Sequence, residues 1–220
     1  MFLTTFFIFS SRARNFSVSN YLMYHDEALG IYNVKFLARK ISELLAENKA
    51  VGNVCCRFNL RKFSLVNKIL GRKTGTVVMK RFVLRLKEIA GDDSYLCRLG
   101  GDNFLMLLPE NKIHDVINFL SGTDVETGKE GNEYIRVSAR ASFLHITEDC
   151  HTTSDIIDRT TLALNMLRET PGSLHFIYDE KARKKEENMR MVEENFLNAI
   201  RNEEFLVYYQ PKAELHDYSL

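Results

Sequence analysis

Two apolar runs flank a glycine pair near the middle of the chain. SYLCRL (94–99) and NFLMLLP (103–109) are separated by Gly100, Gly101 and Asp102. Glycine adopts the positive φ angles of a tight turn at little cost, and apolar runs bounded by turn residues are typical of strands. The pattern predicts a β-hairpin.

The segments before the hairpin are expected to form three helices and one strand. Residues 35–47 place Leu37, Ile41 and Leu44 at helical spacing, which predicts an amphipathic helix. VGNVCCRF (51–58) is a short β-rich run, and two further helices are expected over Lys62–Leu70 and Thr76–Ile89.

The segments after the hairpin continue this alternation. We expect a helix through Ile113–Leu120, a polar loop over 122–133, and then the longest strand, 135–143, whose apolar residues alternate with polar ones. A helix through Ile156–Leu167 and a short strand, LHFIY, follow. The order predicts an α/β (α+β) sandwich, with a mostly antiparallel central sheet of about five strands flanked by helices.

Composition narrows the function classes. The 220 residues carry a formal net charge of +1. The sequence also lacks a basic and aromatic stripe, so we expect no nucleic-acid partner. The four cysteines, Cys55, Cys56, Cys97 and Cys150, have no zinc spacing and no disulfide framework, which favours a reducing, cytoplasmic setting.

The two ends of the chain differ from its middle. We interpret 1–24 as a lead-in, because MFLTTFFIF is apolar but too short for a membrane crossing of about 20 residues. We interpret it as the remnant of either a membrane helix or a sensor domain. In the first case the N-terminal region would tether the domain to the inner membrane. From 180 to 203 the sequence is densely charged, as in a solvated linker helix, and 204–220 begins a new β-rich segment.

Five ordered motifs resemble one family. RLGGDNF (98–104) is similar to RLGGDEF, the hairpin signature of the GGDEF diguanylate cyclases. The segments HDEALGIYN, FSLVNKILGRKTG, ARASFLHI and ALNMLRETPG resemble the family's other motifs in the family's order. The resemblance covers about 25–179 and implies the nucleotidyl-cyclase-like GGDEF fold for that range.

The resemblance implies a reaction and the acids that it needs. Family members condense two GTP molecules, one per subunit of a dimer, into cyclic di-GMP, with magnesium to offset phosphate charge. The family's metal-binding carboxylates fall at Asn59, Arg61 and Asn103 in this sequence, and only Asp102 of the turn remains, as a weak metal ligand. The resemblance therefore predicts a domain without functional catalytic residues, and magnesium only if a nucleotide is bound.

Nucleotide-binding positions are also altered. By the resemblance, Asn67 matches the asparagine that bonds guanine, but the partner aspartate falls at Thr76. Arg168 stands at a phosphate-binding lysine, and the arginine expected four residues later is Gly172. The product-inhibition motif RxxD maps to 91–94 and is absent.

Each of these residues also has an ordinary structural interpretation. Asp102 suits a tight turn, and Asn67 suits an exposed helical surface. Arg168 near a helix C-terminus is favourable for the macrodipole, and Arg61 can be a solvated charge. The signature residues Arg98, Gly100, Gly101, Asp102, Asn103 and Phe104 would then mark the fold rather than a reaction.

The last motif suggests a second domain. NFLNAIRNEEFLVYYQPK (195–212) resembles the start of the EAL cyclic di-GMP phosphodiesterases, where Gln210 would lie beside the ligand. We hypothesise an inactive GGDEF domain that regulates a downstream EAL domain; a GTP sensor without turnover and a structural dimerisation or signal-transmission spacer are the alternatives. GTP, the EAL domain and a second copy of the chain are the candidate partners.

Overall fold

The computed structural model describes residues 21, 23–128, 133–168, 170 and 172–210. The apolar segment 1–9, most of the lead-in and residues 211–220 lie outside the described residues. Among the helices that are described, none is both long and apolar enough to cross a membrane. The chain divides into two units between Asp179 and Glu180.

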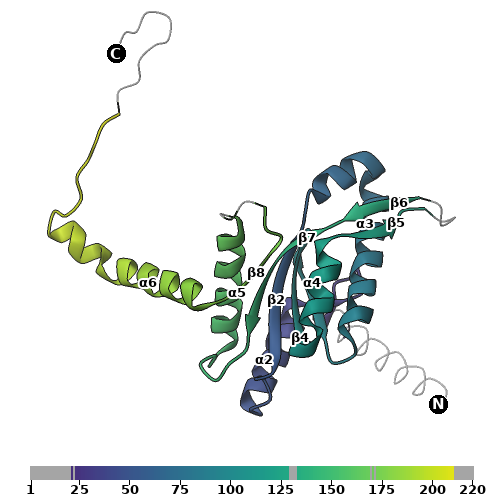
Figure 1. Ribbon diagram of the computed structural model, residues 1–220, viewed down its shortest axis with the longest axis horizontal. Helices are drawn as coiled ribbons and strands as arrows, with labels where there is room; N and C mark the ends of the chain where they lie inside the picture. Colours follow the sequence, from purple (N-terminus) through teal and green to yellow (C-terminus); the bar gives the residue numbers. More distant parts are fainter. Residues whose placement is uncertain (1–20, 22, 129–132, 169, 171, 211–220) are drawn as a thin grey trace, which may run out of the picture. The chain divides into compact units, whose positions relative to one another are not determined.

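The first unit is a layered α/β domain (Figure 1). Its elements, in chain order, are β1 Tyr32–Asn33, α2 Val34–Ala46, β2 Asn53–Leu60, α3 Phe63–Ala90, β3 Tyr95–Gly100, β4 Asn103–Pro109, the short 3-10 helix η1 Glu110–Lys112, α4 Ile113–Ser121, β5 Thr123–Glu126, β6 Tyr134–Val137, β7 Ala139–His145, α5 Thr153–Arg168 and β8 His175–Ile177. The second unit contains α6, Glu180–Arg201.

A mixed sheet of six strands forms the centre of the first unit, in the order β1-β3-β4-β2-β7-β8. The three inner pairings are antiparallel, and the two edge pairings, β1 with β3 and β7 with β8, are parallel. The predicted α/β sandwich with a mostly antiparallel sheet is therefore confirmed. The sequence missed β1 because a strand of two residues is too short to show a periodic pattern.

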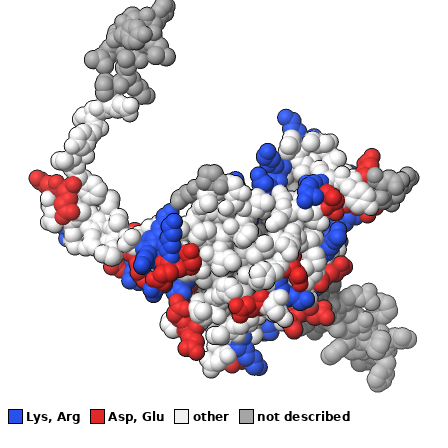
Figure 2. All heavy atoms as spheres, viewed as in Figure 1, with Lys and Arg blue, Asp and Glu red and all other residues white. Residues whose placement is uncertain are grey.

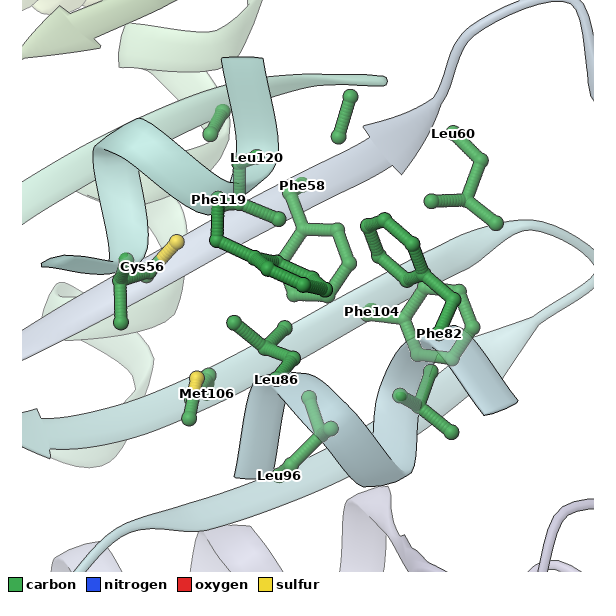
Figure 3. Packing of buried hydrophobic residues seen from close by; sticks show 14 of the residues in the cluster. Cys56, Phe58, Leu60, Phe82, Leu86, Leu96, Phe104, Met106, Phe119 and Leu120 are labelled. Atoms are coloured by element: carbon green, nitrogen blue, oxygen red, sulfur yellow. The ribbon is translucent and has the colours of Figure 1, made fainter. Parts of the chain in front are cut away.

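Side chains alternate along β2, so they point to both faces of the sheet. Helices cover each face and bury these side chains. Cys56, Phe58 and Leu60 point to one face, where α3 and α4 pack; Phe82 of α3 and Phe119 of α4 have ring centroids 4.9 Å apart there (Figure 3). Cys55 points to the other face, which α2 and α5 cover.

Helix α3 has a bend where the sequence predicted two helices. Gly71 has non-helical backbone angles, φ 79° and ψ 155°, so the element consists of two helical parts on either side of it. The second part begins earlier than the predicted Thr76.

Two predictions for 122–143 are wrong. The polar segment expected to be a loop contains β5, which pairs with β6 in a separate two-stranded sheet. Buried Val125 anchors β5, and the Arg81 side chain donates to the carbonyls of Glu126 and Gly128. The single long strand is divided at Ser138, whose carbonyl accepts a bond from Arg61 N instead of continuing one ladder.

The second unit carries an amphipathic helix. Met189, Val192, Phe196 and Ile200 of α6 are exposed along one face, and the Phe196 and Phe205 rings lie 5.5 Å apart. The β-strand expected to begin at 204 is absent from the described residues 204–210, which have no strand partner there. Gln210 lies in this extended, exposed segment.

Candidate functional site

The signature hairpin is formed as the sequence predicts. β3 and β4 pair antiparallel, and Gly100 and Gly101 make the turn with φ 144° and 57°. The carbonyl of Asp102 accepts a bond from Leu60 N at 3.0 Å. Asn103 is the register partner of Asn59. The turn therefore lies beside the carboxyl end of β2, and the pairing of β2 with β4 brings Asn59 and Asn103 together.

The side chains at this point form an amide and carboxylate network. Asn59 Nδ2 donates to Asp102 Oδ1 at 2.9 Å and to Asn103 Oδ1 at 3.2 Å. Asn103 Nδ2 donates to Asp102 Oδ1 and to the Gly100 carbonyl, both at 3.3 Å. The single carboxylate thus accepts two amide N–H groups on one oxygen.

This donor set does not fit magnesium. Magnesium binds hard oxygen ligands, usually including one or two carboxylates, in octahedral geometry. Here Asp102 is the only carboxylate in the network, and its Oδ1 already accepts two amide N–H groups. No group of three or more His, Cys, Asp or Glu side chains arranged for a metal is found among the described residues.

A pocket of about 290 Å³ adjoins the hairpin turn and is lined by Phe63, Ser64, Asn67, Arg72, Thr76, Met79, Arg98, Gly101 and Asp102. The structure thus brings together Asn67, Thr76 and Asp102, three of the candidate binding residues. A volume of this size is near the lower limit of small-molecule sites, roughly 300 Å³, and is sufficient for a nucleobase.

Two contacts determine how the pocket residues lie. A Cβ atom on Gly75 would lie 2.0 Å from Asn67 Oδ1, so only glycine lets Asn67 rest against the second part of α3. Thr76 Oγ1 donates to the Arg72 carbonyl at 3.0 Å. The threonine hydroxyl is therefore engaged with its own helix.

Arg98, the arginine of the signature, holds the turn in place. Its Nε donates to the Gly101 carbonyl at 2.9 Å, and its Nη1 lies 3.3 Å from Asp26 Oδ2. Asp26 also accepts a bond from Leu29 N. The sequence did not identify this ion pair, although Asp26 lies in the HDEALGIYN motif that carried part of the resemblance.

Arg168 lies apart from the pocket at the end of α5. Its Nη1 donates to Asn165 Oδ1 at 3.4 Å, and it does not line the cavity that contains Asn67. Its charge instead acts on Arg57 of β2, a residue that the sequence did not single out. Burial, and then the nearby positive charge of Arg168, lower the pKa of the Arg57 guanidinium.

The fold and this hairpin site define a class of α/β domain that carries a GG-Asp turn beside a pocket large enough for a nucleobase. The profile of the family described as "Diguanylate cyclase, GGDEF domain" matches residues 23–171. The chain belongs to this family, whose domains act in cyclic di-GMP signalling.

Solved structures agree on the fold. The chain resembles the coiled coil and GGDEF domain of DgcB from Caulobacter crescentus in complex with c-di-GMP, with TM-score 0.66, 14% identity, and coverage of 80% of this chain and 96% of that one. It also resembles a diguanylate cyclase/phosphodiesterase from Caldicellulosiruptor saccharolyticus, with TM-score 0.60, 20% identity, and coverage of 68% and 90%.

Curated relatives are longer than this chain. An uncharacterized protein of Mycobacterium tuberculosis is 23% identical over 89% of this chain and 32% of its own length. Signaling protein YkoW of Bacillus subtilis is 23% identical over 70% of this chain and 20% of its own length. The chain thus spans a third or less of the length of these relatives.

Proposed function

We propose that this domain is a catalytically inactive GGDEF module that regulates cyclic di-GMP signalling instead of synthesising the messenger. One observation carries the proposal: Asn59 and Asn103 direct amide N–H groups at Asp102, where the family resemblance places further carboxylates. Arg61, which follows β2 directly, is a positive residue where the family resemblance implies another carboxylate.

The chemistry of cyclisation explains why this loss matters. Joining two nucleoside triphosphates requires stabilisation of negative charge on the attacked phosphate, which divalent cations supply in such reactions. An amide oxygen carries no net charge, and an arginine repels a cation. The domain therefore has the shape of a cyclase site without the groups that would hold its metal.

A product assay tests the proposal. The purified chain is incubated with GTP and either magnesium or manganese, and cyclic di-GMP is measured by chromatography. A GGDEF domain that keeps all its metal-binding acids serves as the control. We expect no product from this chain, and clear formation of cyclic di-GMP would overturn the inactive assignment.

We further propose that the domain controls an EAL phosphodiesterase domain that follows it in the full protein. The support is the EAL-like sequence through Gln210, the exposed apolar face of α6 and the greater length of the relatives. Phosphodiesterase activity of the full protein is compared with that of a form lacking 1–179. Equal activities and equal responses to GTP would contradict control by this domain.

A GTP sensor without turnover is the second candidate, favoured by the pocket that joins Asn67, Thr76 and Asp102. Calorimetry with GTP and with ATP, each with and without magnesium, distinguishes it from a spacer. A sensor binds GTP in preference to ATP. Binding of neither nucleotide at millimolar concentration would leave the structural spacer, for which Asn67→Ala and Asp102→Ala leave the activity of the full protein unchanged.

A further inference from the structure

The exposed apolar side chains of α6 follow a seven-residue repeat. Met189, Val192, Phe196 and Ala199 are separated by three, four and three positions. Residues at this spacing form a narrow stripe along one side of a helix, through which two helices pair in a coiled coil. The first three are 49%, 65% and 47% exposed, and Ile200 beside them is 50% exposed. A stripe of this kind is typically buried against a second helix.

The chain turns back at the end of α6 and extends this stripe. The N–H of Glu204 donates to the carbonyl of Ala199 at 3.0 Å, and Glu203 has φ 56°. Such a bond across a left-handed residue is typical of the Schellman ending of a helix. The turn brings the ring of Phe205 to that of Phe196, with centroids 5.5 Å apart. The stripe therefore ends beside a second aromatic ring.

A hollow lies between the stripe and this folded-back segment. Its volume is about 630 Å³, and it is lined by Phe196, Ile200, Glu203, Phe205 and Leu206. Four of these five residues are apolar, and they are exposed by 47–75%. The hollow thus offers a place for a long apolar side chain from another molecule.

The stripe is complementary to itself when its direction is reversed. Positions 192 and 196 are equally far from position 194, and so are positions 189 and 199. Around a two-fold axis at this point, Val192 faces Phe196 of a second copy, and Met189 faces Ala199 and the hollow beside it. The flexible methionine side chain suits an irregular hollow. Such a contact uses the same patch on both chains, as two-fold dimers do.

The charges at the two ends of the stripe favour the reversed arrangement. Lys185 lies one turn before Met189, and Glu203 lines the hollow at the other end, equally far from position 194. Antiparallel helices bring this lysine of each copy to the glutamate of the other, whereas parallel helices bring like charges together. Figure 2 shows largely uncharged surface along the C-terminal half of α6 and acidic side chains beside its end.

We propose that α6 pairs with α6 of a second copy of this chain, antiparallel and around a two-fold axis near position 194, with Met189 of each copy in the hollow of the other. This homodimer contact goes beyond the proposed function, because it uses none of the hairpin residues. Few side chains take part, and an interface below roughly 1,200 Å² is typical of weak association. We therefore expect a dimer that dissociates on dilution.

Sedimentation velocity of the 220-residue protein over a range of concentrations tests for this dimer. We expect the sedimentation coefficient to rise between about 1 μM and about 500 μM, the range of weak interfaces. A chain that stays monomeric throughout this range would overturn the proposal and leave the apolar face to a domain that follows in the full protein. The inactive assignment fails separately, through cyclic di-GMP in the product assay.

Two methionines on opposite sides of α6 locate the contact. Met189→Ser removes the side chain assigned to the hollow and should raise the dissociation constant at least about tenfold, as the loss of a buried anchor does. Met191→Ser is the matched control, because Met191 is 57% exposed and two positions along a helix turn it to the opposite side. Both changes cost the helix the same propensity. Equal effects, or an unchanged dissociation constant for Met189→Ser, would overturn the assignment.

Cross-linking determines the direction of the two helices. Met189→Cys and Ala199→Cys are prepared separately in a Cys150→Ser background and oxidised, each alone and as a mixture. In the antiparallel dimer the two positions 189 lie about 15 Å apart along the helix axis, whereas position 189 of one copy faces position 199 of the other. We expect a disulfide-linked dimer only from the mixture. Cross-linking of Met189→Cys with itself, or no cross-link in the mixture, would overturn the antiparallel pairing.

Discussion

Asn59 Nδ2 lies 2.9 Å from Asp102 Oδ1, so an amide N–H donates into the one carboxylate that the hairpin site retains. The contact joins residues 43 positions apart in sequence across the β2–β4 pairing. It links the hairpin turn to the end of β2, and it occupies a lone pair of the Asp102 carboxylate with an amide donor.

Asn59→Asp combined with Asn103→Glu should restore a response to metal. The double variant places three carboxylates at one point, which repel one another until a divalent cation binds. Ligand binding to the folded state raises the midpoint of thermal unfolding. We expect millimolar manganese to raise the midpoint of the double variant by several degrees and to leave that of the wild type unchanged.

The control for this variant introduces the same two negative charges at positions away from the hairpin. Asn111→Glu with Asn118→Asp alters two exposed asparagines of η1 and α4 in the same way. A manganese response in this control, or none in the site variant, would contradict the account of the missing ligands.

Arg98→Ala should destabilise the domain more than a typical surface arginine. The Arg98 and Asp26 side chains are 19% and 24% exposed, whereas those of the Arg136–Asp124 pair are 69% and 61% exposed. Loss of the partly buried pair and of the bond to Gly101 should cost about 1–3 kcal/mol. Arg136→Ala should cost about 0–1 kcal/mol. Urea denaturation measures both, and equal costs would argue against a structural role for Arg98.

The sequence predicted those parts of the fold that local patterns determine. The hairpin follows from two apolar runs around Gly100 and Gly101, and the helices follow from apolar residues at helical spacing. Strand β5 was missed because TDVE has only Val125 as an apolar residue. Its stability comes from tertiary contacts, the burial of Val125 and the Arg81 bonds, which no local pattern indicates.

The candidate site was predictable to a similar extent. Alignment to the family motifs located Asn59, Asn67 and Asp102, and the structure places all three near the hairpin turn. Arg57 was missed because it stands within an apolar run and its contact with Thr161 depends on the packing of α5 against β2. The sequence did contain one indication of this residue: Arg57 precedes Asn59 by two positions, so the two side chains lie on the same side of β2.

The buried thiols should be almost inert at neutral pH. Burial raises the pKa values of Cys55 and Cys56, and that of Cys97 to about 12, so the reactive thiolate form is scarce until the pH is strongly alkaline. We expect Ellman's reagent to label these three only after unfolding in urea. Cys150 is also buried, at 3% exposed, but it lines a pocket, so it should react before the other three, and Cys150→Ser should abolish labelling of the native protein. Rapid native labelling of Cys97 would contradict the packing of this face.

Gly75→Ala tests the position of Asn67. Alanine in a helix interior is favoured over glycine by about 1 kcal/mol, but the new Cβ would lie 2.0 Å from Asn67 Oδ1. The asparagine side chain must therefore move, and part of the gain is lost.

In an Asn67→Ala background nothing opposes the methyl group, so the same substitution should stabilise the protein by the full amount. Urea denaturation of the wild type, the two single variants and the double variant gives the coupling between the sites. Equal gains in both backgrounds would place Asn67 away from Gly75. A coupling between the two substitutions would show that the residue 75 methyl group and the Asn67 side chain are in contact, so Gly75→Ala shifts Asn67 without removing any polar group of the pocket.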